Sequence, residues 1–235
     1  MDKAAPAALI ADATAAGGKT ANGYEPTLKR LGRTEYTDAW QAMRAFTDAR
    51  TPDAADEIWL TEHSPVYTLG LAGRPEHILR ATTIPVLKVD RGGQITYHGP
   101  GQLVVYLLID LKRLRVGVRA LVEAIESAVI KLLDSYGIEA YGRRDAPGVY
   151  VKRVGVEAKV AALGLKVRNG CTYHGFALNL DMDLAPFDDI DPCGYRGLAV
   201  TQLRDLDVRA SATEIEERLM RNVTQAIAGI DRKSR

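Results

Sequence analysis

The sequence predicts a single α+β domain, and three features of its pattern support this. Residues 102–111 (QLVVYLLIDL) form a nearly continuous apolar run of strand length, which is typical of a central buried strand. Apolar side chains then recur at helical spacing from Val118 to Tyr136, ahead of Gly137, which would end the helix. Strand and helix patterns alternate without the regular spacing of a doubly wound sheet. With 235 residues, 46% of them hydrophobic, the chain can bury one large core.

The other elements follow from shorter patterns along the chain. A helix should begin near Thr37, which suits an N-cap position, because apolar residues then recur at helical spacing. Ser211 and Glu214 match the capping-box pattern before a last helix. In residues 154–162 the apolar side chains alternate with others, so Lys159 should project opposite the apolar row. Further strands are expected at residues 57–60, 85–89 and 172–180.

The N-terminal segment differs in composition from the rest of the chain. Residues 1–24 are rich in Ala, Gly and Thr and almost lack large apolar side chains, so they can bury little surface to offset the entropy of ordering. We therefore expect a flexible tail, followed by one folded domain over residues 25–235. That domain has no internal repeats and no linker pattern. A monomer is the default expectation.

Charge and composition exclude several classes of protein. The 31 basic and 30 acidic residues leave a formal charge of +1, so the total lacks the basic excess of a nucleic-acid binder. No apolar run approaches the roughly 18 to 20 residues of a membrane span, and no signal-peptide pattern is present, so we expect a cytoplasmic protein. Two cysteines without a CxxC motif and four scattered histidines predict neither a disulfide framework nor a metal site.

A glycine-rich loop joins two of the expected strands. Residues 91–102 (RGGQITYHGPGQ) hold four glycines, which let the backbone approach a ligand and offer unhindered N–H donors. Arg91 and His98 would add polar contacts to such a ligand. The alternative is a tight connection between core strands in which His98 is simply hydrogen-bonded. The order of residues matches neither a P-loop nor a dinucleotide fingerprint.

Either of the two cysteines could serve as a nucleophile. Cys193 lies in DPCGYRG, where proline and glycine leave the thiol little neighbouring bulk. Cys171 begins a strand pattern and is more easily interpreted as a small packed residue, so the pattern favours Cys193 without deciding the matter. The thiolate is the nucleophile, and an unperturbed thiol with a pKa of about 8.5 is mostly protonated at neutral pH. A basic side chain must therefore lie close by.

Two basic side chains could assist a cysteine. Lys159 lies in the uncharged, small-residue segment 158–164, where partial desolvation would lower its pKa and let it exchange protons with a thiol or an amine. The alternative is an ordinary solvated lysine. His174, in YHGFA, is a second candidate, although a hydrogen-bonded core histidine fits its surroundings better. His63 and His77 carry no motif.

Four motifs, in this order, resemble those of the lipoyl(octanoyl) transferase family: RGGQITYHGPGQLVVY, AKVAALGLKV, CTYHGFALNL and DPCGYRGLAVTQL. The resemblance covers about residues 28–208, with no departure at the motif positions. It implies a mixed sheet flanked by helices, similar to the catalytic domain of the lipoate and biotin protein ligases. It also implies that Cys193 is the acyl-accepting nucleophile and Lys159 its acid/base partner, which decides between the two cysteines.

The resemblance further implies the partners and the substrate-binding residues. The donor would be octanoyl acyl carrier protein, and the acceptors would be lipoyl domains of 2-oxoacid dehydrogenase E2 subunits and the glycine-cleavage H protein. Thioester exchange is nearly balanced and amide formation is downhill, so no ATP, metal or organic cofactor is expected. The implied binding residues are Arg91, Gly92, Gly93, Gln94, Ile95, Thr96, Tyr97, His98, Ala162, Leu163, Gly164, Gly175, Phe176 and Ala177.

Two other functions fit parts of the sequence. An ATP-dependent lipoate or biotin ligase also has a glycine-rich loop that begins with arginine, but it needs no cysteine nucleophile. A non-catalytic protein that binds acyl carriers or lipoyl domains would have little reason to retain both Cys193 and Lys159. Dependence of product formation on ATP would separate the ligase from the transferase.

Two basic clusters could attract an acidic carrier protein. The first comprises Lys112, Arg113, Arg115 and Arg119, and the second comprises Arg143, Arg144, Lys152 and Arg153. The alternative is that both are solvated faces. We expect the second cluster to hold the carrier, because it precedes Lys159 by only a few residues.

Overall fold

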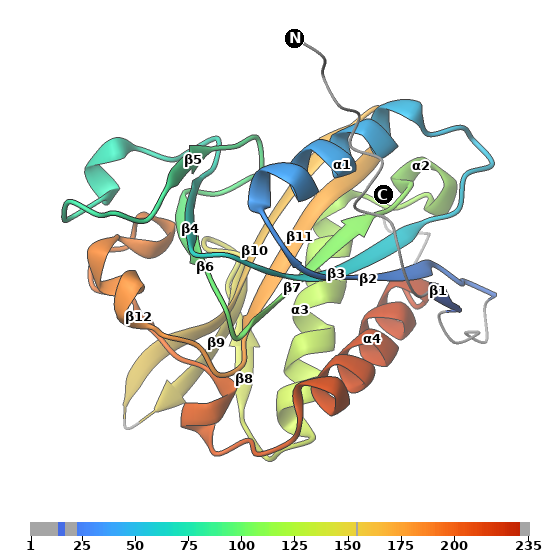
Figure 1. The fold of residues 1–235 in the computed structure, drawn as a ribbon. Helices are drawn as coiled ribbons and strands as arrows, with labels where there is room; N and C mark the ends of the chain where they lie inside the picture. Colours follow the sequence, from blue (N-terminus) through green and yellow to red (C-terminus); the bar gives the residue numbers. More distant parts are fainter. Residues whose placement is uncertain (1–13, 17–22, 154, 231–235) are drawn as a thin grey trace, which may run out of the picture.

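The structure, a computed structural model, describes residues 14–16, 23–153 and 155–230 (Figure 1). Its main sheet is mixed, because β2 pairs with β3 and β10 with β12 in parallel while the other neighbours are antiparallel. In spatial order its strands are β1 (Thr14–Ala16), β2 (Thr27–Thr34), β3 (Glu57–His63), β7 (Gln102–Leu108), β11 (Cys171–Asn179), β10 (Val156–Arg168), β9 (Gly148–Arg153) and β8 (Ala140–Gly142), with β12 (Ala199–Val200) beside β10.

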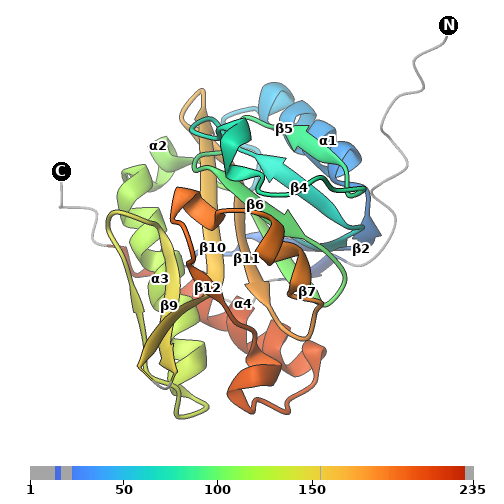
Figure 2. The same ribbon diagram turned by 90° about the vertical axis from the view of Figure 1, so that its left-hand side faces the viewer.

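A smaller sheet and the helices cover the main sheet. The small sheet has the order β5 (Val86–Lys88), β4 (Val66–Leu69) and β6 (Ile95–His98). The α-helices are α1 (Tyr36–Ala49), α2 (Leu111–Leu114), α3 (Val118–Asp134) and α4 (Ala212–Ala228). The connections between the described elements include the 3₁₀ helices η2 (Pro75–His77), η3 (Ala185–Asp189), η4 (Pro192–Gly194) and η5 (Leu203–Leu206). Figures 1 and 2 show α3 and α4 on one face of the main sheet, and α1 with the small sheet on the other.

The central strand β7 is buried on both faces, as its continuous apolar run predicted. Val105 and Leu107 belong to the large core beneath α3 and α4, whereas Val104 and Tyr106 belong to the core beneath α1. This division follows from the alternation of side chains along a strand. The strand ends at Leu108, three residues before the predicted end, because Asp110 instead caps α2 by accepting a hydrogen bond from the backbone N–H of Arg113.

The predicted α+β fold is confirmed, and most predicted element positions agree within a few residues. Ser211 caps α4 by accepting a hydrogen bond from the N–H of Glu214, as the capping box predicted. Gly137 follows α3 with a positive φ of 74°, in the role expected of it. The prediction of Thr37 as an N-cap is wrong. The helix begins at Tyr36 with Glu35 as its N-cap, and the burial of the Tyr36 ring fixes this end rather than a side-chain cap.

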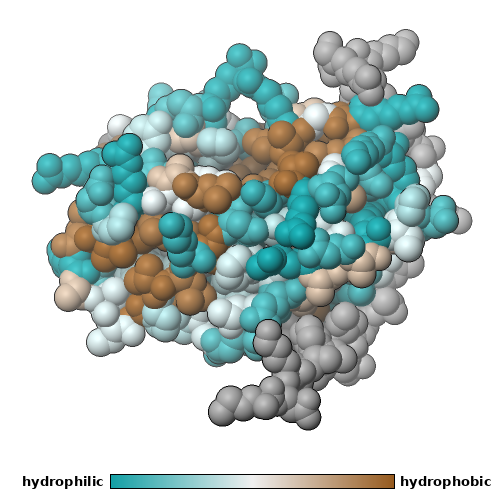
Figure 3. Space-filling view, turned by 90° about the horizontal axis from the view of Figure 1, so that it is seen from above, coloured by the Kyte–Doolittle hydropathy of each residue, from teal (hydrophilic) through white to brown (hydrophobic). Residues whose placement is uncertain are grey.

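Most of the predicted tail lies outside the described residues, but Thr14–Ala16 pair with β2 at the edge of the sheet. The strand expected at 154–162 is observed from Val156 and continues to Arg168. No helix within the described ranges is long and apolar enough to cross a membrane. The end of the molecule that carries α1 and β5 presents a mostly hydrophilic surface with separate hydrophobic areas (Figure 3).

Candidate active site

A strip of the main sheet carries almost no side chains. Ala162 on β10 lies opposite Ala177 on β11, and Gly164 lies opposite Gly175. Residues directly opposite on neighbouring strands project from the same face, so these two pairs leave a groove on the face that α1 covers. A Cβ at position 175 would lie 2.0 Å from the carbonyl oxygen of Val105, so the approach of β7 to β11 requires glycine there.

The groove is covered by β6 and by the loop before it, and the resulting cavity is called here the inner pocket. It encloses about 470 Å³ of empty space, part of which is open to solvent. Twelve of the fourteen residues predicted to bind substrate line it: Arg91, Gly93, Gln94, Ile95, Thr96, His98, Ala162, Leu163, Gly164, Gly175, Phe176 and Ala177. Three segments far apart in the sequence thus meet around one cavity.

Two of the predicted residues lie elsewhere. Tyr97 lies among buried residues under the small sheet, with its ring 5.5 Å from that of Tyr67 and 5.6 Å from that of Phe187. Side chains alternate along β6, so Tyr97 points away from the face that Thr96 and His98 present to the pocket. Gly92 lines a neighbouring cavity, and its N–H donates to the carbonyl oxygen of Leu165.

Arg91 binds the protein rather than offering its donors to a ligand. Its guanidinium donates to the carbonyl oxygens of Thr68, Gly92 and Gln94, and to the hydroxyl of Thr68. The residue is buried, and these contacts hold the glycine-rich loop in a closed turn. Arg91 thus shapes the wall of the inner pocket, and its predicted contact with a ligand stays a prediction.

Aromatic and imidazole rings close one end of the inner pocket, which we call the deep end. The ring of Tyr36 stacks on His98 at 5.5 Å and on His174 at 6.4 Å between centroids, and the ring of His63 lies 5.0 Å from it. The hydroxyl of Tyr106, whose residue also lines the pocket, lies 2.5 Å from Nε2 of His63. The sequence had suggested no role for His63, and this residue is completely buried behind the pocket.

Asp90 fixes the deep end from outside the pocket. Its carboxylate accepts hydrogen bonds from the indole N–H of Trp40 and the hydroxyl of Tyr173, and it lies 3.0 Å from Nε2 of His174. Burial acts to raise the pKa of Asp90, but these partners outweigh it and hold the pKa well below its usual value. His174 has a φ of 59°, a conformation uncommon for a residue with a side chain, in the middle of β11. The prediction of a hydrogen-bonded core histidine is confirmed.

The three histidines of the deep end are uncharged at neutral pH. Burial lowers the pKa of His63 to about 4, and it also lowers the pKa of His98 and that of His174. The carboxylate of Asp90 opposes the shift of the His174 pKa without cancelling it. The deep end of the pocket is therefore polar but without charge on its rings.

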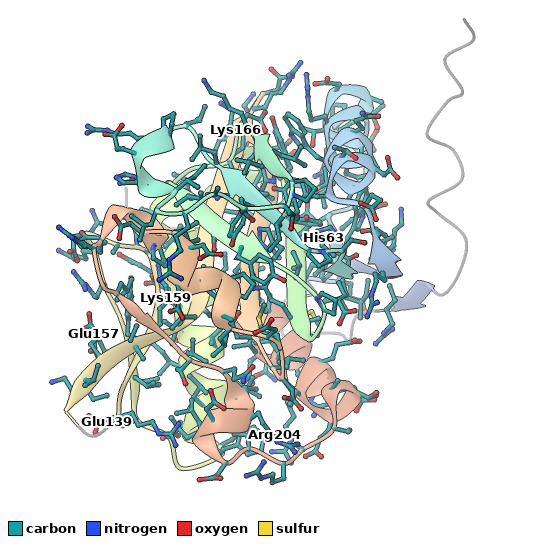
Figure 4. The ribbon with its side chains drawn as sticks, turned by 60° about the vertical axis from the view of Figure 1, so that its left-hand side comes forward. His63, Glu139, Glu157, Lys159, Lys166 and Arg204 are labelled. Carbon is teal, nitrogen blue, oxygen red and sulfur yellow. The ribbon has the colours of Figure 1, made fainter. Side chains whose placement is uncertain are left out.

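Lys159 is buried at the opposite end of the pocket. Its ammonium donates to the carbonyl oxygen of Pro147 at 3.2 Å and lies 5.1 Å from the centre of the Tyr150 ring. It lines a small cavity, the lysine pocket, which shares Thr96 and Ala162 with the inner pocket. Figure 4 shows Lys159 well apart from His63, which lies behind the deep end. A solvated lysine, the alternative left open by the sequence, does not match this burial.

Two further residues position Lys159. A Cβ at Gly148 would lie 2.4 Å from Cε of Lys159, and Gly148 has a φ of 152°, so no other residue fits there without displacing the lysine. Its N–H donates to Glu126 of α3 at 2.8 Å, which anchors the segment that carries Pro147. Burial raises the pKa of Glu126, although this hydrogen bond and the charge of Lys159 oppose the shift.

Cys193 lies in η4, which packs against β6. Its neighbour Pro192 lines the lysine pocket, and a Cβ at its other neighbour, Gly194, would lie 2.4 Å from the side-chain amide of Gln94 in the pocket wall. The turn that carries Cys193 therefore lies between the lysine pocket and the inner pocket. Cys171 begins β11 far along the sheet, buried, and burial raises the pKa of its thiol. The interpretation of Cys171 as a packed residue agrees with this position.

A third cavity, the outer cavity, lies on the other side of the wall formed by Gly93, Gln94, Leu163 and Gly164. Tyr195, two residues after the cysteine, lines it and donates from its hydroxyl to Asp145 at 2.9 Å. The guanidinium of Arg143 lies 5.1 Å from the Tyr195 ring and also pairs with Asp145 and Glu157. These contacts join the cysteine turn to the β8–β9 connection. In the described parts of the chain, no group of three His, Cys, Asp or Glu side chains could hold a metal ion.

Solved structures with similar folds are ligases that modify proteins with lipoate or biotin. A bipartite lipoate protein ligase from Thermoplasma acidophilum matches with a TM-score of 0.66 at 17% identity, covering 85% of this chain and 82% of that one. A biotin protein ligase from Aquifex aeolicus, in complex with biotin and ATP, matches with a TM-score of 0.55 at 12% identity, covering 88% and 72%. At these identities the likeness shows the fold alone.

Sequence relatives are much closer. The octanoyltransferase of Dechloromonas aromatica is 58% identical over 86% of this chain and 97% of its own length, and that of Chromobacterium violaceum is 56% identical over 82% and 91%. The model of the lipoyl protein ligase A/B catalytic domain matches residues 35–224. The chain therefore belongs to the lipoyl protein ligase A/B catalytic-domain family and, within it, to the octanoyltransferases, acyltransferases of lipoate biosynthesis.

Proposed function

We propose that the chain transfers an octanoyl group from acyl carrier protein to a lysine of a lipoyl domain or of glycine-cleavage H protein through a thioester on Cys193. The observation that carries this proposal is the arrangement at one end of the inner pocket. A buried lysine, the turn that holds Cys193 and the end of the inner pocket at Thr96 and Ala162 lie side by side there. Acyl transfer through a thiol needs those three parts together.

In the first half-reaction, the Cys193 thiolate attacks the carbonyl carbon of the octanoyl thioester. The bond from that carbon to the carrier sulfur breaks, and the Lys159 ammonium gives a proton to the departing thiolate. The N–H of Leu163 would suit the oxyanion. Leu165 directs its carbonyl away from β11 and toward Gly92, and Leu163, two residues earlier on the strand, faces the same edge. The N–H of the next residue, Gly164, faces β11, so Leu163 is the better candidate of the two.

In the second half-reaction, the amine of the acceptor lysine attacks the enzyme thioester. Neutral Lys159 takes a proton from the attacking nitrogen, and the Cys193 thiolate leaves. The products are an octanoyl amide and the free carrier thiol, and the enzyme returns to its starting protonation state. The energy of the thioester drives the amide bond, so the step calls for no ATP, and none of the protein groups requires a metal or an organic cofactor. We propose the cytoplasm as the location, where the sequence predicts it.

The proposal is tested by incubating the protein with octanoyl carrier protein in the absence of ATP and measuring its intact mass. A single octanoyl adduct is expected, and adding a lipoyl domain should move that group to the domain. Cys193→Ala should form no adduct and transfer nothing, because only a thiol at the substrate carbonyl becomes the thioester.

Cys171→Ala is the matched control and should retain most of the transfer activity, since Cys171 lies at the far end of β11. An adduct on Cys193→Ala would contradict the covalent mechanism. Product that forms only with ATP would favour a ligase, and binding of the carrier without any adduct would favour a non-catalytic protein.

A further inference from the structure

The length of the inner pocket matches an eight-carbon chain. One end lies at Ala162 of β10, which is shared with the lysine pocket, and the other lies at His174, which lines the pocket and is paired with position 165 of β10. Three residues of strand separate them, which is about 10 Å at ~3.3 Å per residue. An extended octanoyl chain spans about 9 Å from carbonyl to methyl carbon, because each C–C bond of ~1.5 Å advances it by ~1.3 Å.

Tyr36 forms the end of this pocket and has little freedom to move. Its ring lies between His98 and His174 and is buried, and its hydroxyl lies 3.3 Å from Nδ1 of His174. His174 is held in turn by Asp90, and His98 by the side chains of Gln102 and Thr68. A rotation of the Tyr36 ring would break contacts on both sides. The end of the pocket is therefore a fixed wall and not a side chain that yields to a longer ligand.

The same wall is chemically unsuited to additional methylene groups. A chain of ten carbons would press its end against the Tyr36 hydroxyl and two imidazole rings, and it would disturb the hydrogen bonds that these buried groups make. The sides of the pocket differ from its end, since Val104 and the Ala162–Ala177 pair present apolar atoms to the chain. The pocket thus favours a chain that stops before Tyr36.

We propose that Tyr36 is the residue that limits the acyl chain to about eight carbons. This inference rests on the proposed function, because it assumes that the inner pocket receives the acyl chain of the thioester. Tyr36 lies in the first turn of α1, more than fifty residues before the glycine-rich loop, and belongs to none of the segments that the motifs marked. It acts on chain length and not on the reacting carbonyl, which lies at the other end of the pocket.

The test is a competition in one vessel between octanoyl and dodecanoyl thioesters of the same carrier, with the two products on a lipoyl domain counted by mass. The product ratio does not depend on how much enzyme is active, so partial misfolding does not affect it. Tyr36→Ala should raise the ratio of dodecanoyl to octanoyl product about tenfold or more. Tyr36→Leu, which fills more of the space and is safer for folding, should raise it less.

Tyr36→Phe is the matched control, since it removes the hydroxyl and keeps the ring that blocks the pocket. Its product ratio should stay much closer to that of the unmodified chain than to that of Tyr36→Ala. Unchanged ratios in both the Ala and Leu variants would overturn the inference. Absence of any octanoyl product from the unmodified chain would instead contradict the proposed function, so the two failures are distinguishable.

Discussion

Gly148 and Lys159 are packed so closely that one constrains the other. The glycine lies on the first position of β9, and the lysine side chain passes over it to reach the carbonyl oxygen of Pro147. The ammonium therefore has a fixed position beside the cysteine turn, where a proton donor must be placed to within a fraction of an ångström. This contact is as important to the proposed chemistry as the lysine itself.

Gly148→Ala should lower the rate of octanoyl transfer by about 10²-fold. The added methyl group would displace the end of Lys159, and a catalytic group displaced by about 1 Å can slow a reaction by that factor. Overpacking should also lower the free energy of unfolding by about 1 to 3 kcal/mol. The measurements are single-turnover transfer rates and urea unfolding. Gly117→Ala, where a Cβ would meet no atom within 4 Å, is the control and should transfer normally. Equal rates for the two variants would show that Lys159 tolerates displacement.

Lys159→Met should fold and lose transfer by about 10²-fold or more, because an apolar side chain of similar length keeps the packing and cannot move a proton. Lys159→Arg should fail as well, since a guanidinium keeps its charge and does not give up its proton. Rates of both half-reactions, measured separately, check this. An Arg variant with near-normal rates would limit Lys159 to an electrostatic role.

Several residues around the candidate site could not be predicted from the sequence, and the physical reason is the same for each. Gly148 follows a proline and has the pattern of an ordinary turn, and its importance arises only from the lysine that the β9–β10 pairing brings over it. Tyr36 and Tyr106 are common core residues, and only the fold brings them to the same pocket. The glycine-rich loop and Lys159 were found because their local composition is unusual for a strand connection and for a strand.

Helix α1 and the strands beneath it enclose three histidines in an arrangement that depends on their being neutral. His63 lies between the backbone of Thr34 and the hydroxyl of Tyr106 and is fully buried, so a charged ring would be cut off from solvent. Its pKa of about 4 in the folded chain is below the value of about 6.5 in the unfolded chain. The unfolded state therefore binds more protons in this range, and acid favours unfolding.

The free energy of unfolding should fall as the pH is lowered from about 6.5 through 4, with roughly 2 kcal/mol lost at pH 5 through His63 alone. His98 and His174 shift in the same direction and should add to the loss. Urea unfolding at pH 7 and pH 5 measures the difference, and His63→Gln should reduce it, because the amide does not titrate. A pH dependence unchanged by this substitution would show that His63 is not responsible.

At the level of elements, the sequence predicted type and order better than boundaries. The β7 run is strong because nearly all of its residues are buried, and the α3 periodicity is strong because one face of that helix is buried. The start of α1 was misplaced because burial of the Tyr36 ring decides it. The end of β7 was misplaced because Asp110 caps α2 instead of continuing the strand. The small sheet was predicted only as separate strands, since nothing local indicates which strands pair.

Across the whole molecule, the basic clusters differ in how much of their charge is available to a partner. Arg143 is committed to Asp145 and Glu157, and Arg113 to Asp56. In the second cluster, the exposed side chains of Arg144 and Lys152 have no ion pair among the described residues. Arg144 lies three residues from Pro147, and Lys152 is two residues along β9 from Tyr150, which lies opposite Lys159. Both cations are therefore close to the site at which the proposed mechanism places the carrier arm.

Replacing Arg144 and Lys152 with glutamate reverses both charges and should slow acylation of the enzyme by octanoyl carrier protein. The expected cause is that the carrier is strongly acidic, so its association is steered by charge. The loss should appear as a lower association rate. It should shrink as salt is added, because at 0.1 M salt the attraction between charges more than about 10 Å apart is largely screened. Acylation by octanoyl-CoA, which needs no protein docking, should change much less. Arg143 is left unchanged because its substitution would also disturb the Tyr195 and Asp145 contacts of the cysteine turn.

The same reversal at Lys112 and Arg115 is the matched control for this prediction. Lys112 packs against Gly170 beyond the end of β10, and nine residues of that strand, about 30 Å at ~3.3 Å each, separate Arg168 from Lys159. A carrier held there could not present its thioester at the site, although the change in net charge is identical. Equal losses from the two reversals would assign the effect to net charge alone. No loss from either one, across a salt series, would mean that the carrier docks on another face.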